Sequence, residues 1–108
     1  MTYQEYQRLI MDATEFDDEE LYIADAGGSM PESVPDELLV PMLREMYDYA
    51  HSRTLGTLLK QTGMNRAEFG REYRVPYRTL QHWDDGDRGA RAYVLDLVAY
   101  AVIMRDRD

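Results

Sequence analysis

The chain has 108 residues, 44% of which are hydrophobic, a net charge of −9 and no cysteine. The length suits one domain or a small domain with an appendage. The hydrophobic fraction argues against global disorder, and the lack of cysteine excludes disulfides and thiolate metal ligands. No apolar run approaches the roughly 20 residues that span a bilayer. The first twenty residues also lack the pattern of a secretory signal, so we expect a cytoplasmic protein without membrane contact.

The charge is unevenly distributed along the chain. Residues 1–53 carry 13 acidic and three basic side chains, whereas residues 54–108 carry eight acidic and nine basic ones. We therefore expect an acidic helical N-terminal extension over residues 1–53, packed on a second unit over residues 54–108. An acidic surface of this kind can also bind a protein partner.

The first predicted helix covers residues 2–13. Tyr3, Tyr6 and Ile10 recur at helical spacing and form one apolar stripe. Thr2 and Glu5 have the spacing of a capping box, in which each side chain bonds the backbone amide of the other residue.

A second helix is predicted over residues 17–25, where an acidic start suits the positive end of the helix dipole. We expect Leu21, Tyr22 and Ile23 to be buried in it. The glycines, serine and proline of residues 26–31 predict a break after this helix.

A third helix is predicted by a broad apolar face that ends near residue 50. Pro41 would remove a helical hydrogen bond if it lay inside, so we expect the helix to start near Pro41. Residues 51–53 should interrupt it. The residues of the face are Leu39, Met42, Leu43, Met46, Tyr49 and Ala50.

Residues 54–62 predict a fourth helix that is capped by Thr54. Leu55 and Leu58 take core positions. Burying a leucine side chain contributes about 1.5–3 kcal/mol of stability. We therefore expect Leu59 to pack against the N-terminal helices rather than to stay exposed.

The stretch 64–88, MNRAEFGREYRVPYRTLQHWDDGDR, predicts two short helices joined by a tight corner. Asn65 and Glu68 form the capping box of the first, and Gly70 leaves room for a second helix to come close. Pro76 fits the first turn of that second helix. Leu80 and Trp83 lie on one face of it, and we expect Trp83 to be part of the core.

This stretch resembles the Cro/C1-type (Xre-like) helix-turn-helix DNA-binding family. Residues 63–70, GMNRAEFG, are similar to the family's first-helix pattern, and residues 75–88 are similar to its recognition helix and following turn. The likeness covers roughly residues 54–103. It implies an all-α, lambda-repressor-like helix-turn-helix domain whose recognition helix, about residues 76–84, enters the major groove. The chain departs from the family pattern in having Arg66 where a glutamine is usual.

Seven residues are implied as contacts to double-stranded DNA. Arg78 can bond guanine, Gln81 can bond adenine, and Tyr77 can contact a thymine methyl or a phosphate. His82 and three further arginines are expected at the phosphate backbone. The complete set is Arg66, Arg74, Tyr77, Arg78, Gln81, His82 and Arg88.

The last predicted helix covers residues 91–103 and is apolar nearly all round, which is typical of a helix that is enclosed or shared with a partner. We expect a homodimer through this C-terminal helix, with Tyr93, Tyr100 and Met104 at its surface.

No enzymatic site is expected. The serines have no plausible histidine partner, and no glycine-rich phosphate loop follows a strand. Asp84, Asp85 and Asp87 surround Gly86 but lack the distal glutamate of a calcium loop. We therefore expect neither a metal nor another cofactor.

The sequence thus predicts sequence-specific binding of double-stranded DNA, by a small transcriptional regulator or an antitoxin-like repressor. The alternative is a protein-interaction module on a helix-turn-helix scaffold, such as a toxin neutraliser or a phage-derived adaptor, that binds DNA weakly or not at all. An open recognition helix favours the first reading, and residues 15–25 folded over that helix would favour the second.

Overall fold

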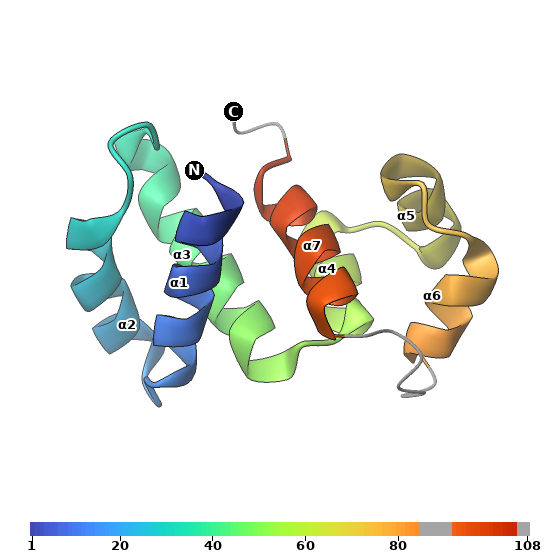
Figure 1. Cartoon of the computed structure of the whole chain (residues 1–108), viewed down its shortest axis with the longest axis horizontal. Coiled ribbons are helices and arrows are strands. Elements are labelled where there is room, and N and C mark those ends of the chain that lie inside the picture. Colours follow the sequence, from blue (N-terminus) through green and yellow to red (C-terminus); the bar gives the residue numbers. More distant parts are fainter. Residues whose placement is uncertain (85–91, 106–108) are drawn as a thin grey trace. The chain divides into compact units, whose positions relative to one another are not determined.

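The computed structural model describes residues 1–84 and 92–105, and these residues form seven α-helices and one short 3₁₀ helix, without a strand (Figure 1). The expectation of an all-α protein is confirmed. None of the helices in these two ranges has the length and apolar character needed to cross a membrane. The helices are α1 (Tyr3–Thr14), α2 (Glu19–Ala26), η1 (Gly27–Ser29), α3 (Asp36–Ser52), α4 (Leu55–Thr62), α5 (Arg66–Tyr73), α6 (Tyr77–Asp84) and α7 (Ala92–Ile103).

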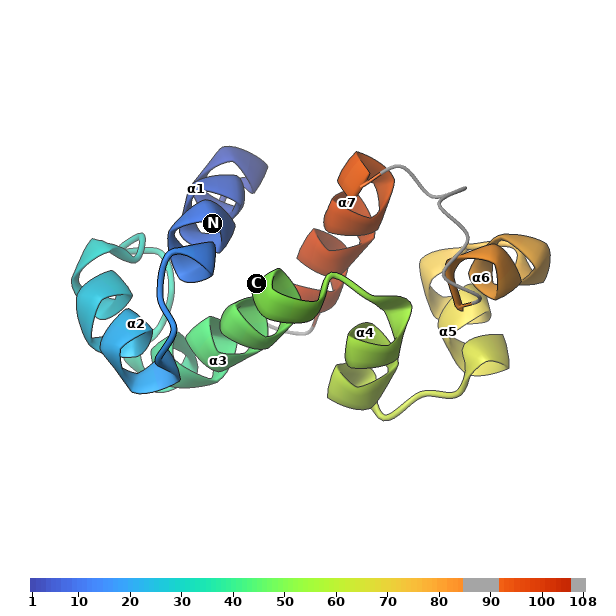
Figure 2. The same ribbon diagram turned by 90° about the horizontal axis from the view of Figure 1, so that it is seen from below.

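The helices divide into two compact units (Figure 2). The N-terminal unit comprises Met1–His51 together with the residues from Ile103 onward, and the C-terminal unit comprises Ser52–Val102. Arg105 ties the end of the chain to the N-terminal unit, because its two terminal nitrogens each donate to one carboxylate oxygen of Glu45 on α3 at 3.0 Å. This two-pronged geometry fixes orientation as well as distance.

Helix α1 begins with the predicted capping box. The Glu5 amide donates to the Thr2 hydroxyl at 3.1 Å, and the Thr2 amide donates to the Glu5 carboxylate at 2.7 Å. The hydrogen bond from the Thr2 amide holds the pKa of the Glu5 carboxyl below its usual value.

Tyr22 of α2 lies at the centre of the N-terminal unit. It is fully buried, its hydroxyl donates to the Leu9 carbonyl of α1 at 2.9 Å, and its ring lies 5.8 Å from the rings of both Phe16 and Tyr47. Helix α3 also holds α1 through His51, whose Nε2 donates to the Ala13 carbonyl near the C-terminus of α1 at 2.8 Å. Aromatic packing and hydrogen bonds to backbone carbonyls therefore join the three helices.

Replacing Tyr22 by phenylalanine should destabilise the chain by about 1 kcal/mol at neutral pH, because a buried hydrogen bond is lost. Burial raises the pKa of the Tyr22 phenol, so the unfolded chain releases this proton before the folded chain does. The contribution of Tyr22 is thus complete below about pH 10, the usual phenol pKa, and declines above it. Urea unfolding at pH 7 and 10.5 measures this effect: the free energy of unfolding should fall less between the two pH values in Tyr22→Phe than in the wild type. Tyr77→Phe, which changes an exposed tyrosine, is the control and should show the same alkaline decline in stability as the wild type. If Tyr22→Phe also declined as much as the wild type, the pH dependence could not be assigned to Tyr22.

Helix α2 does not bury the three consecutive residues that the sequence predicted. Tyr22 is buried and Ile23 is half-buried, but Leu21 is 61% exposed. Successive residues of a helix point about 100° apart, so a helix that packs on one side cannot bury three in a row.

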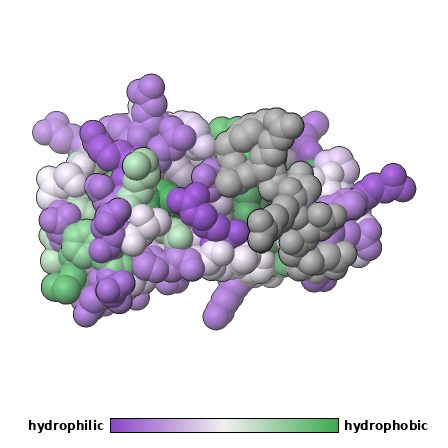
Figure 3. All heavy atoms as spheres, turned by 60° about the horizontal axis from the view of Figure 1, so that its bottom comes forward, coloured by the Kyte–Doolittle hydropathy of each residue, from purple (hydrophilic) through white to green (hydrophobic). Residues whose placement is uncertain are grey.

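The face drawn in Figure 3 is mostly hydrophilic, with smaller hydrophobic areas. Besides Leu21, the large hydrophobic side chains exposed on the N-terminal unit are Met11 and Val40.

Helix α3 starts earlier than predicted and contains Pro41. It begins at Asp36, five residues before the proline. Pro41 is therefore close enough to the N-terminus that only one backbone bond, to the carbonyl of residue 37, is lost. The exposed ring of Pro41 lies away from the core. Five of the six predicted face residues are buried and Leu39 is half-buried; the buried ones are Met42, Leu43, Met46, Tyr49 and Ala50.

The C-terminal unit begins with α4, whose first turn is capped as predicted. The Thr57 amide donates to the Thr54 hydroxyl at 3.3 Å. Leu55 and Leu58 are buried, whereas Leu59 is half-buried. The guanidinium of Arg53, just before α4, contacts both carboxylate oxygens of Asp96 on α7, at 3.1 and 3.3 Å. This pair links α7 to the start of α4.

Candidate functional site

Helix α5 supports the candidate site. Asn65 and Glu68 form the predicted capping box, with bonds of 2.9 and 3.0 Å. Phe69 is fully buried and its ring contacts that of Tyr73, with 4.7 Å between the centroids. The helix ends at Tyr73, and Arg74, which caps its C-terminus, adopts a left-handed conformation with φ 55°. Because residues other than glycine and asparagine seldom adopt this backbone conformation, the corner at Arg74 is locally strained.

The connection after α5 closes tightly over Gly70. The Val75 amide donates to the Gly70 carbonyl at 3.0 Å. A Cβ atom at position 70 would lie 2.9 Å from the Val75 carbonyl oxygen and 3.2 Å from Cδ1 of Leu80. The close approach that the sequence predicted at Gly70 is therefore confirmed. The absence of a side chain here sets how near the corner and α6 come to α5.

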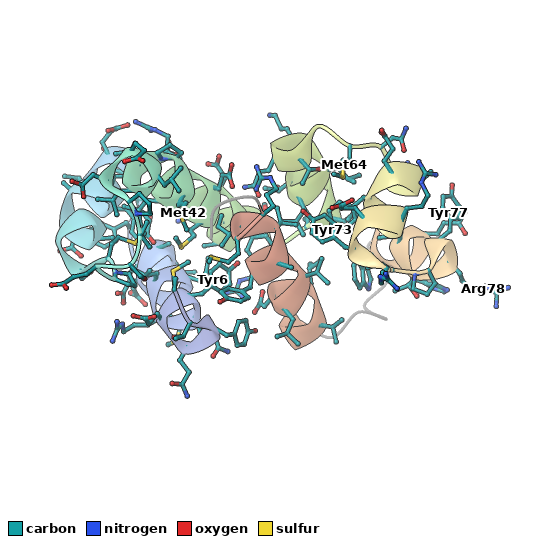
Figure 4. All side chains as sticks on the ribbon, turned by 90° about the horizontal axis from the view of Figure 1, so that it is seen from above. Tyr6, Met42, Met64, Tyr73, Tyr77 and Arg78 are labelled. Atoms are coloured by element: carbon teal, nitrogen blue, oxygen red, sulfur yellow. The ribbon has the colours of Figure 1, made fainter. Side chains whose placement is uncertain are left out.

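Helix α6 has one anchored side and one exposed side. It starts at Tyr77 rather than at Pro76, although the Pro76 carbonyl accepts the first helical hydrogen bond, from the Leu80 amide at 3.1 Å. Leu80 is fully buried, and α6 packs against both α4 and α5. Figure 4 shows Arg78 projecting away from the helices, whereas Tyr77 borders the space between α5 and α6. The exposed residues of α6 follow helical spacing and are Tyr77, Arg78, Gln81 and His82.

Trp83 is half-buried rather than part of the core. It is the next-to-last residue of an eight-residue helix, and the deepest position on this side of α6 belongs to Leu80 one turn earlier. The expectation that Trp83 belongs to the core is met only in part, because one side of the tryptophan stays exposed.

Six of the seven residues predicted to contact DNA fall on α5, α6 or the corner between them. Arg66 is the first residue of α5 and is half-buried, and Arg74 is exposed at the corner. Among the side chains that the structure describes, no carboxylate is paired with Arg74 or Arg78. Arg88 lies outside the described residues.

The residues expected at a dimer surface are only partly described. Tyr100 and Met104 are half-buried, and the side chain of Tyr93 lies outside the description. On α7, Leu97 is 47% exposed.

The aspartates at positions 85 and 87 also lie outside the described residues. Within the parts of the chain that the structure describes, no group of three histidine or carboxylate side chains is placed to hold a metal ion.

A groove of about 280 Å³ lies between α5 and α6, and the sequence did not predict it. Ala67, Gly70 and Leu80 contribute apolar walls, while Arg66 and Arg71 line it with their guanidinium-bearing chains. Positions 66, 67, 70 and 71 share one face of α5, so helical spacing groups them. Only the angle of α6 turns this face into a groove, because Leu80 comes from the second helix.

Comparisons with protein-family models, with curated proteins and with solved structures find no match to this chain. A function for this chain therefore has to be inferred from the geometry and chemistry of α5 and α6.

Proposed function

We propose that this protein binds double-stranded DNA in a sequence-specific manner, as a small transcriptional regulator or an antitoxin-like repressor. The observation that carries the proposal is the two-sided character of α6: Leu80 anchors one side in the core, and the side away from it exposes Arg78, Gln81 and His82, with Tyr77 exposed at the edge of this face. A helix held from behind with a polar outer face is what a major groove accommodates.

The exposed side chains have the chemistry that reads base edges. A guanidinium can donate two bonds to guanine O6 and N7, and a primary amide can pair with adenine N6 and N7. Arg78 and Gln81 supply these groups at i and i+3, so both lie on the outer face of α6. Tyr77, 56% exposed at the first position of α6, is placed to contact a thymine methyl or a phosphate.

Phosphate contacts are assigned to Arg66 and Arg74. Both are near the ends of α5, at its first residue and at the corner that follows it. In a helix-turn-helix the first helix crosses the DNA backbone while the second enters the groove. The likeness of residues 54–103 to the Cro/C1-type family supports the same orientation, with Arg88 as a further phosphate contact.

The charge distribution sets the expected strength of binding. Residues 52–102 carry eight basic and six acidic side chains, whereas residues 1–51 carry two basic and 13 acidic ones. The C-terminal unit is thus only weakly positive, and the acidic unit repels a polyanion over the screening length. We expect modest affinity and a clear dependence on salt. If two copies bind through α7, their half-sites lie about 34 Å apart.

Selection of bound sequences from random duplexes at low and moderate salt tests the proposal. We expect enrichment of a short motif at both salts, and tighter binding of that motif than of scrambled duplexes. Gln81→Ala should change the enriched motif. Lys60→Ala, which removes an exposed cation of α4 outside the α5–α6 face, is the matched control and should leave the motif unchanged. Equal binding of all duplexes would contradict sequence-specific recognition.

Arg74→Gly should separate stability from DNA affinity. Glycine adopts the left-handed corner without strain, so the variant should be more stable by about 1 kcal/mol. Loss of one phosphate contact should weaken binding to all duplexes equally and reduce the slope of log K against log salt by about 0.9. Urea unfolding and fluorescence anisotropy measure the two effects. A loss confined to the preferred duplex would instead assign Arg74 to base contact.

A further inference from the structure

The groove between α5 and α6 is suited to a side chain rather than to a large ligand. Its volume of about 280 Å³ lies just below the range of about 300–1,000 Å³ for small-molecule sites. Ala67, Val75 and Leu80 make it apolar, whereas Arg66 and Arg71 add positive charge. An occupant that fits this combination has one aliphatic group between carboxylates.

Helix α2 presents such a group. Leu21 is 61% exposed, although burying a leucine side chain is favourable. Asp18 and Asp25 precede and follow it by three and four residues, so both lie beside it on the helix surface. Both aspartates are exposed. Glu19 and Glu20 contact Arg44 on the side toward α3. On the Leu21 side, Asp18 caps α2 through one carboxylate oxygen, which accepts from the Glu20 and Leu21 amides at 2.8 and 3.3 Å.

We propose that the α5–α6 groove of one copy of this chain receives Leu21 of a second copy. The aliphatic side chain enters between Ala67, Val75 and Leu80, and the flanking aspartates meet the guanidinium groups of the groove. Undocked, Leu21 of one copy and Ala67 with part of Val75 in the groove of the other stay in contact with water. Docking covers both surfaces, and the charges are opposite in sign. The large excess of acid in residues 1–51 and the cluster of arginines on α5 and α6 favour the same orientation over longer distances.

This contact joins two different surfaces, so it is heterologous. Every copy carries one groove and one knob, which consists of Leu21 with its flanking aspartates Asp18 and Asp25 on α2. Copies can therefore associate head to tail into rings or short chains. A single leucine in a small groove buries far less than the roughly 1,200–2,000 Å² of a stable interface. The association is therefore weak and concentration-dependent. It is also weakened by salt, because the charges that steer it are at the surface.

The contact has a regulatory consequence that rests on the proposed function. Tyr77 borders the groove and also belongs to the exposed face of α6. A copy docked in the groove thus covers part of the surface assigned to DNA, and self-association and duplex binding compete.

Sedimentation velocity over a wide concentration range, at low and at high salt, measures the association of the full chain without DNA. The wild type should shift from monomer to larger species as concentration rises at low salt, and this shift should be much smaller at high salt. Leu21→Ser should raise the dissociation constant at least about tenfold. Met11→Ser, which changes another exposed hydrophobic residue of the same unit, is the matched control and should behave as the wild type.

The groove is tested in the same way by Arg71→Glu. Its control is Lys60→Glu, which changes the net charge equally at an exposed position outside the groove. Arg71→Glu should abolish association and Lys60→Glu should not.

Mixing the two defective chains provides the decisive measurement. The Leu21→Ser chain keeps its groove and the Arg71→Glu chain keeps its knob, so the mixture should form a one-to-one complex although neither chain associates alone. Recovery in the mixture also shows that both variants are folded. A wild type that stays monomeric at all concentrations, a Leu21→Ser chain that associates like Met11→Ser, or a mixture without complex would each overturn the proposal.

Duplex binding distinguishes this proposal from the proposed function. Measured at a concentration where the chain is monomeric, Leu21→Ser should bind its selected duplex as the wild type does, because α2 is not part of the DNA face. Failure to find any duplex would leave the association measurements unaffected.

Discussion

Arg78→Ala should lower the affinity for the preferred duplex by about 1–3 kcal/mol and relax the sequence preference at one position. The reason is geometric: Arg78 is exposed on α6, is unpaired with any carboxylate of the described residues, and projects away from the core (Figure 4). A guanidinium that bonds one guanine at two atoms loses both bonds on truncation. Fluorescence anisotropy with the selected duplex and with single-base variants of it measures both effects.

Arg78→Lys is the sharpest control for this prediction. Lysine keeps the charge but lacks the planar fork that bonds two acceptors at once. We expect this variant to retain most of its affinity for unrelated duplexes and to lose discrimination at the same position as Arg78→Ala. If Arg78→Lys kept the full sequence preference, or if Arg78→Ala weakened all duplexes equally, Arg78 would be a phosphate contact only.

Gly70→Ala should destabilise the chain by about 1–2 kcal/mol, because the new Cβ would lie 2.9 Å from a backbone carbonyl oxygen that cannot move without displacing the corner. Alanine is otherwise a better helix former than glycine by up to about 1 kcal/mol, so steric conflict must outweigh that gain. Since the corner sets the position of α6, duplex affinity should fall as well. Urea unfolding and anisotropy on the same sample measure the two losses.

Gly56→Ala is the matched control in α4. The nearest atom to a Cβ at position 56 is the Thr54 hydroxyl oxygen at 3.8 Å, which is ordinary contact. The same chemical change should therefore stabilise the chain here by about 0.5–1 kcal/mol. Opposite signs at the two glycines would show that the close approach, rather than helix propensity, decides the effect at Gly70. Destabilisation at both positions would contradict this explanation.

The helices themselves could be predicted from local sequence because their ends are local. Thr2, Thr54 and Asn65 cap their helices through side chains that reach amides only three residues away. The apolar positions of α3 recur at helical spacing, and most of them are buried. Such signals need no knowledge of the rest of the chain.

Other features depended on which side of a helix meets a neighbour. Leu21 and Tyr22 are equally hydrophobic to a pattern search, yet only Tyr22 points toward α1 and α3, where its hydroxyl finds the Leu9 carbonyl. Pro41 was read as a helix start because proline disfavours helix interiors, but its position near the N-terminus of a long helix with a buried face makes one lost hydrogen bond tolerable. In both cases the packing of the helix against its neighbours decided the outcome.

The sequence by itself determined the helical class, the main caps, the separation of acidic from basic residues, and the small residue at position 70. Periodicity, capping and charge are properties of neighbours along the chain, so they can be read from it. Only the tertiary structure decided that Leu21 stays exposed, that Trp83 is half-buried, and that one face of α5 becomes the wall of a groove. These outcomes depend on the direction from which a second helix approaches, and that direction is set by contacts between residues that are not neighbours in sequence.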